Sequence, residues 1–199
     1  MNNVFRKRVH RPGPFLRDLG TLLWSLPSLF SMMRARRLSR AFAEKLMLAT
    51  TAVNQCVLCA RVHSEMAFDN GVPREEVLTL LNQDLGEGRF AREEEQTALL
   101  YAQHYAETER KPEPGRTARL EEVYGREKAG DILLVLKIIN FFNLCGNTFS
   151  AFTARFRGLR AEGSSLLFEA VFFLFSAPAI LVFSLYARLR GNRFSFQNR

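Results

Sequence analysis

The pattern of hydrophobic and polar positions predicts helices along most of the chain. In residues 38–53, Phe42, Leu46 and Ala49 recur at helical spacing and form one apolar stripe, with Glu44 off that stripe. Glycine, proline and capping signals bound further predicted helices, which cover residues 54–69, 74–81, 92–109, 117–124 and 127–156. Few segments show the period of two that a half-buried strand requires. We therefore expect an all-α protein.

An apolar segment near the C-terminus is long enough to cross a bilayer. No charge interrupts residues 170–186, and extension back past Glu169 to Leu166 gives about 20 residues. The segment is rich in phenylalanine and is followed by three arginines, Arg188, Arg190 and Arg193, which are typical of a membrane-interface flank. We expect this additional helix to span or lie in a membrane. Burial of the helix in a homo-oligomer is the alternative.

A second apolar segment lies near the N-terminus. Residues 19–33 are uncharged but are interrupted by Pro27, and basic residues flank them on both sides. A signal peptide would require a small-residue cleavage site, whereas the chain continues with Arg34, Ala35, Arg36 and Arg37. We predict a helix that packs on the domain or lies at a membrane interface, because basic flanks favour anionic lipid.

The formal net charge of +8 favours an acidic partner. Basic residues concentrate at the two ends and form no recognised nucleic-acid motif, so we expect membrane lipid as a partner and no nucleic acid. Three cysteines, two of them in one CxxC, are typical of a reducing compartment. We expect a membrane-associated protein with its catalytic domain on the cytoplasmic side, and a soluble cytoplasmic protein is the alternative.

The richest candidate chemistry lies in residues 54–63. On a helix, Cys56, Cys59 and His63 would share one face, within reach of one another. Asn54 is a candidate N-cap, which would put both cysteines in the first two turns, where the helix dipole favours a thiolate. With Glu44 preceding them, these residues predict thiol redox chemistry.

Two hypotheses account for the cysteines without redox chemistry. Cys56, Cys59, His63 and Cys145 could hold zinc, although structural zinc sites usually show two paired knuckles and the chain has one. Alternatively, the cysteines fill a core as small apolar residues. For Cys145, which has no CxxC partner, packing in a core is the simplest interpretation.

The spacing of these residues resembles the alkylhydroperoxidase D (AhpD-like) branch of the carboxymuconolactone decarboxylase superfamily. Eleven residues separate Glu44 from Cys56, two separate Cys56 from Cys59, and three separate Cys59 from His63. Residues 68–81 and 98–102 also resemble segments of that family. The resemblance implies an AhpD-like helical bundle over residues 38–160, with a basic and apolar N-terminal extension (1–37) and the apolar C-terminal helix with its basic tail (161–199).

The resemblance also implies roles for the four residues. Cys59 would attack an organic hydroperoxide, Cys56 would resolve the product as a disulfide, and Glu44 and His63 would relay protons. No cofactor or metal is implied. The partners would be the hydroperoxide and an external dithiol reductant of thioredoxin-like or lipoyl type. Because members of the family tend to form oligomers, the resemblance also implies a homo-oligomer. One departure is Leu58, where well-studied members carry a second histidine, so the relay is shorter here.

Other functions remain open at this point. The superfamily also contains cofactor-free decarboxylases, which resemble it in fold and do not need a CxxC. A non-enzymatic, membrane-associated helical module with structural or redox-sensing thiols is a third candidate. Among the remaining polar residues, we interpret His104 as structural. The asparagines at 140, 143 and 147 either line a peroxide pocket or hydrogen-bond across a helix or subunit interface.

Overall fold

The computed structural model describes residues 4–86, 90 and 92–190, and it confirms an all-α protein. Eight helices lie in this part of the chain: α1 (Pro12–Trp24), α2 (Leu26–Ala35), α3 (Arg40–Asn54), α4 (Val57–Asp69), α5 (Arg74–Leu81), α6 (Glu93–Glu107), α7 (Pro114–Arg155) and α8 (Leu166–Arg190). The only strands in the described residues are β1 (Val4–Phe5) and β2 (Arg160–Ala161), which pair in parallel. The predicted helix at 74–81 matches α5, and the other predicted ends differ by a few residues.

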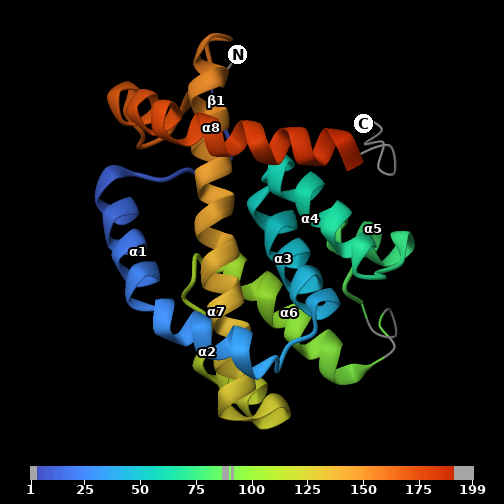
Figure 1. Cartoon of the computed structure of the whole chain (residues 1–199). Coiled ribbons are helices and arrows are strands. Elements are labelled where there is room, and N and C mark those ends of the chain that lie inside the picture. The colour runs from blue at the N-terminus through green and yellow to red at the C-terminus, as the bar shows by residue number, and fades with distance from the viewer. Residues whose placement is uncertain (1–3, 87–89, 91, 191–199) are drawn as a thin grey trace.

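Helix α3 lies at the centre of the bundle and packs against α4, α5, α6 and α7 (Figure 1). The Ser39 hydroxyl caps its start by accepting a hydrogen bond from the Phe42 amide. Its apolar stripe joins a core whose fully buried members include Leu46, Leu48, Leu99, Ile132 and Leu136. Burial of this stripe orders the helix that carries Glu44.

Helix α7 contains both of the helices predicted at residues 117–124 and 127–156. Gly125 has non-helical backbone angles, with φ at 72° and ψ at 158°, so the helical axis breaks there. Glycine meets this requirement because it lacks the Cβ that makes a positive φ unfavourable. The break separates the segments predicted at 117–124 and 127–156, and the second of them runs the full height of the bundle (Figure 1).

The predicted N-terminal apolar helix is divided into α1 and α2. The division falls at Ser25, and Pro27 occupies the first turn of α2, where a missing amide hydrogen costs little. Both helices contact α7, yet several of their large apolar side chains face outward. Trp24 is 89% exposed and Phe30 is 69% exposed.

Helix α8 crosses α7 and extends over α4 (Figure 1). Phe173 stacks on Phe149 with ring centroids 4.5 Å apart, and Glu169 is fully buried in an ion pair with Arg155. Both α7 and α8 are long and apolar enough to cross a membrane, by length and composition alone. In α7 most of the apolar stretch is buried inside the protein, whereas only 6% of that of α8 is buried.

Candidate functional site

Cys56 and Cys59 form a disulfide at the start of α4, with their Cα atoms 5.3 Å apart. The prediction that Asn54 caps this helix is wrong, because α3 continues through Asn54 and ends in a left-handed turn at Gln55 (φ 56°). Cys56 is itself the N-cap, and its sulfur accepts a hydrogen bond from the Cys59 amide at 3.3 Å. Only two residues separate α3 from α4, so the turn leaves no room for a longer cap.

The disulfide lies against α7. A Cβ added to Gly146 would approach the Cys56 sulfur to 2.6 Å, closer than packed atoms allow, so glycine permits this contact. One turn earlier on α7, the Phe142 carbonyl oxygen lies 3.8 Å from the Cys59 sulfur. Cys56 is 1% exposed and Cys59 is 9% exposed. Cys59 is therefore the more accessible sulfur of the pair.

Glu44 and His63 bring α3 and α4 together beside the cysteines. The Glu44 carboxylate accepts a hydrogen bond from His63 Nδ1 at 2.7 Å, and Glu44 is 4% exposed. Because the carboxylate occupies Nδ1, a neutral His63 carries its proton there and leaves Nε2 as the basic nitrogen. His63 follows Cys59 by one helical turn. The arrangement therefore offers a positioned base near the thiol pair.

The three asparagines of α7 hydrogen-bond across helices, which supports the second of the two interpretations of these residues. Asn140 accepts from the Asn54 amide at 2.9 Å, and Asn143 accepts from the Thr51 hydroxyl at 3.0 Å. Asn147 donates to the Asn54 carbonyl at 2.8 Å. These bonds hold the end of α3, and hence the turn that leads to Cys56, against α7.

The remaining candidates lie outside this group. Cys145 is a free, half-buried thiol, and burial raises its pKa to about 12. His104 accepts a hydrogen bond from the Glu113 amide at 3.2 Å, which agrees with a structural role. Within the described residues, no three His, Cys, Asp or Glu side chains are grouped so that they could hold a metal ion.

Sequence reasoning did not identify Gly146 or the hydrogen bonds of Thr51 and Asn54 as parts of the site. Gly146 had a usable signal, because a glycine inside a strongly helical segment often marks close approach of another group. The sequence contains no comparable signal for the hydrogen bonds of Thr51 and Asn54. Their partners lie more than 80 residues away in the chain, and only the packing of α3 on α7 brings them together.

Together, the fold and the site define an all-α protein that holds a CxxC disulfide beside a hydrogen-bonded glutamate and histidine. Residues 27–103 match the profile described as the Carboxymuconolactone decarboxylase family, and this segment contains all four of these residues. This segment is therefore similar to that family, which includes the AhpD-like branch. Searches of curated proteins and of solved structures gave no significant match.

Proposed function

We propose that this protein is a thiol peroxidase that reduces organic hydroperoxides through Cys56 and Cys59. The single observation that carries the proposal is the disulfide at the N-terminus of α4, one turn from a histidine held by Glu44. A disulfide between cysteines three residues apart is suited to repeated opening and closing, because both sulfurs stay in place on one helix. Similarity to the family supports enzymatic chemistry of this general type.

In the proposed cycle, the Cys59 thiolate attacks the outer oxygen of ROOH. The O–O bond breaks, Cys59 becomes a sulfenic acid, and the leaving alkoxide takes a proton to form ROH. The Cys56 thiol then displaces hydroxide from that sulfenic acid, which leaves as water, and the disulfide forms. His63 Nε2 accepts the thiol proton and returns it to the leaving group, while Glu44 orients the ring. An external dithiol, of thioredoxin-like or lipoyl type, reduces the disulfide and completes the cycle.

The greater exposure of Cys59 supports its role as the attacking sulfur. Cys56 accepts the Cys59 amide hydrogen bond, which would stabilise it as the thiolate released when the dithiol reductant attacks Cys59. Leu58 occupies the position of the second family histidine, so His63 and Glu44 supply the proton transfer by themselves.

The test is to mix reduced protein with one equivalent of cumene hydroperoxide and to follow free thiols and intact mass. We expect rapid loss of two thiols and two hydrogen atoms in the native protein. Cys56→Ser should instead trap an added oxygen atom on Cys59, and Cys59→Ser should be inert. Cys145→Ser is the matched control and should behave as the native protein. Thiols that stay reduced in the native protein would contradict the proposal.

Two other functions predict different results in further assays. A cofactor-free decarboxylase would retain its lactone-decarboxylating activity in the Cys56→Ser, Cys59→Ser double variant. A non-enzymatic module would form the disulfide slowly and would show no turnover when dithiol and peroxide are both supplied. A non-enzymatic module gives no specific purpose to the hydrogen bond between His63 and Glu44.

We also propose that α8 lies in the plane of a membrane. Its inner face is attached near both ends: Glu169 pairs with Arg155, and Tyr186 donates to the Asp69 carboxylate of α4 at 3.4 Å. The outer face is apolar, and its most exposed members are Leu167, Leu174, Phe175, Leu181, Val182 and Leu189. Exposed arginines lie before the helix, at Arg157 and Arg160, and near its C-terminal end, at Arg188. Apolar area between basic flanks matches an anionic bilayer surface.

The proposed position of α8 in the membrane plane suggests a class of substrate and a cellular location. Because α8 packs on α4, the helix that begins at the disulfide lies beside the proposed membrane face. Lipid hydroperoxides are therefore the candidate substrates, with the domain on the cytoplasmic side. We expect turnover of phospholipid hydroperoxides in vesicles at rates comparable to those with cumene hydroperoxide. Activity toward the small peroxide alone would rule out the lipid substrate and leave the thiol chemistry intact.

Vesicle flotation tests the membrane contact directly. Native protein should float with vesicles of phosphatidylcholine and phosphatidylglycerol, and Phe175→Asp with Leu181→Asp should abolish flotation. Leu78→Asp, at a half-exposed site on α5, is the control and should float. If the native protein instead forms a stable homo-oligomer that the double variant dissociates, and it does not float, α8 is a subunit interface.

A further inference from the structure

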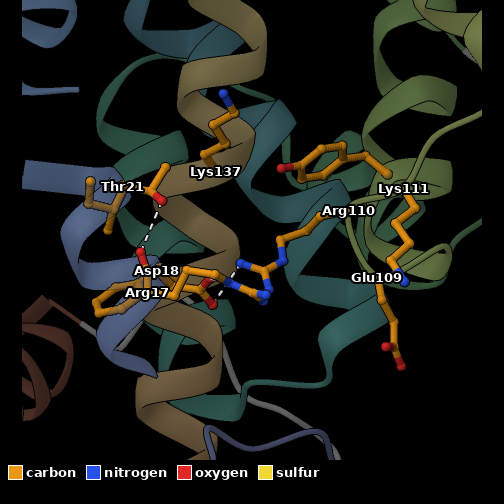
Figure 2. A pocket seen from close by; sticks show the side chains of 10 residues that line it. Arg17, Asp18, Thr21, Glu109, Arg110, Lys111 and Lys137 are labelled. Atoms are coloured by element: carbon orange, nitrogen blue, oxygen red, sulfur yellow. Dashed lines mark hydrogen bonds and ion pairs between the residues drawn. The ribbon is translucent and has the colours of Figure 1, made fainter. Parts of the chain in front are cut away.

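Two adjoining cavities lie between the N-terminal arm (residues 4–11), α1 and the segment that follows α6. Their volumes are about 610 and 260 Å³, and they share Arg17, Asp18, Glu109, Arg110 and Lys111. Figure 2 shows Arg110 reaching from the segment after α6 to Asp18 on α1. Neither cavity is lined by the cysteines, Glu44 or His63. The larger one therefore needs an explanation separate from the thiol chemistry.

The larger cavity has a marked excess of positive charge. It is lined by seven cations, Arg6, Lys7, Arg8, Arg11, Arg17, Arg110 and Lys111, and by three carboxylates, Asp18, Glu109 and Glu162. Asp18 is already paired with Arg110 at 2.7 Å, and Glu109 lies 3.8 Å from Arg8. In the described part of the chain, no carboxylate lies within ion-pair distance of Lys7, Arg11 or Lys111. Burial lowers the pKa of Lys7, and an anion beside it would offset that cost.

Two buried residues that line the same cavity, His10 and Asn54, each carry a hydrogen-bond acceptor without a partner. His10 is 1% exposed, and its Nε2 donates to the Phe141 carbonyl at 3.2 Å, which leaves Nδ1 as an unpaired acceptor. Asn54 is 2% exposed, and its Oδ1 is unpaired because its amide nitrogen donates to Asn140. Buried polar atoms are nearly always paired, so both atoms call for a donor from outside the chain.

We propose that this cavity binds a polyol phosphate, with the phosphate against Lys7, Arg11 and Lys111 and hydroxyl groups donating to His10 and Asn54. Cations alone would accept any anion. The two acceptors add a requirement for donors, which a phosphate ester of glycerol or a sugar satisfies and chloride does not. A glycerophosphate group occurs both as a free metabolite and in the headgroup of an anionic phospholipid, and both present phosphate oxygens and hydroxyl groups to the site.

Calorimetric titration at constant ionic strength tests the site with glycerol 3-phosphate, inorganic phosphate and glycerol. We expect saturable binding of glycerol 3-phosphate, weaker binding of phosphate and none of glycerol. Lys7→Gln with Lys111→Gln should weaken binding by about 10- to 100-fold, the effect of losing charged hydrogen bonds. Lys7→Arg should retain it. The matched control is Arg126→Gln, an exposed cation on α7 away from the cavity, and it should bind as the native protein.

Vesicles distinguish the two sources of the ligand. If the headgroup is bound, flotation with phosphatidylglycerol vesicles should fall in the lysine double variant and should be competed by glycerol 3-phosphate. If a free metabolite is bound, flotation should be unchanged while the titration still depends on the lysines. Absent binding, or binding that is equal in the lysine double variant, would overturn the proposal. Variants of α8 should keep glycerol 3-phosphate binding, which separates this site from the membrane contact.

Discussion

At the scale of single residues, the site depends on close contacts that each require a particular residue type. The Glu44 carboxylate is buried and faces the His63 ring, and the Cys56 sulfur serves as both disulfide partner and helix cap. Gly146 leaves the space that this sulfur occupies. Substitutions that change only one atom type or add one methyl group should therefore have measurable effects on the reaction rate or on stability.

Replacing Glu44 with glutamine should slow peroxide-dependent thiol oxidation by about 10²-fold, the usual contribution of a positioned proton-transfer group. The amide is nearly the same size but has no charge to stabilise the protonated His63 that forms as the thiol proton is transferred. Rapid-mixing measurements with cumene hydroperoxide check this. Glu121→Gln, at an exposed position on α7, is the control. An unchanged rate would remove Glu44 from the proton relay.

Replacing Gly146 with alanine should lower the free energy of unfolding of the oxidised protein by about 1–3 kcal/mol, the usual cost of overpacking. The new methyl group would meet the Cys56 sulfur at 2.6 Å. Gly130 lies on the same helix with nothing within 4 Å of an added Cβ. Gly130→Ala should therefore stabilise by up to ~1 kcal/mol through helix propensity. Urea unfolding of both variants checks the difference in sign. Stabilisation by Gly146→Ala would contradict the prediction, because it would mean that the surrounding atoms move to accommodate the methyl group.

At the scale of elements, the placement of α8 is the feature with the widest consequences. Phe168 and Phe172 contact Phe15 of α1, and Phe173 contacts two rings of α7, so aromatic packing attaches the first half of the helix. Ala187 is fully buried near the other end. A helix attached near both ends covers the bundle and does not project from it.

Replacing Arg155 with methionine should destabilise the docking of α8 by about 3–5 kcal/mol, because Glu169 would stay buried without its partner. Hydrogen exchange of the α8 amides is the measurement, and their protection should fall. Arg119→Met breaks an exposed pair with Glu122 and should change little, in line with the ~0–1 kcal/mol of surface ion pairs. Removing both charges with Arg155→Met and Glu169→Leu should restore protection. Unchanged protection in the single variant would mean that aromatic packing suffices.

At the scale of the whole molecule, the N-terminal arm connects the two ends of the chain to the core. β1 pairs with β2, and the His10 amide donates to the Thr148 hydroxyl of α7 at 2.9 Å. The His10 ring lies between Phe15 and Phe141. The arm therefore shares in the global unfolding transition, and the titration of His10 should affect overall stability.

Stability should fall as the pH is lowered from 6.5 towards 4 because of His10. Burial lowers the pKa of this group to about 4, whereas the unfolded chain takes up the proton near 6.5. Between these values the unfolded state binds more protons, so acid favours unfolding by up to ~1.4 kcal/mol per pH unit. Chemical denaturation across this range should show the slope, and His10→Gln should reduce it. His104→Gln is the control, and an equal slope in His10→Gln would contradict the assignment.

The sequence alone was enough for the fold class and for naming four residues of the candidate site. Helical periodicity, glycines and prolines located the helices, because these depend on local backbone preferences. Helical spacing predicted that Cys56, Cys59 and His63 lie on one face of a helix. The resemblance to the family pattern added Glu44, which lies on another helix.

Only the tertiary structure decided the rest, because it depends on contacts between segments far apart in the chain. Composition did not show that α8 packs on α7 and α4, where Glu169 forms a buried ion pair with Arg155. The cap at Cys56 followed from the tight turn between α3 and α4. The cavity lined by Lys7, His10 and Lys111 exists only because the arm folds back onto α7 and the segment after α6, and no local pattern encodes that approach.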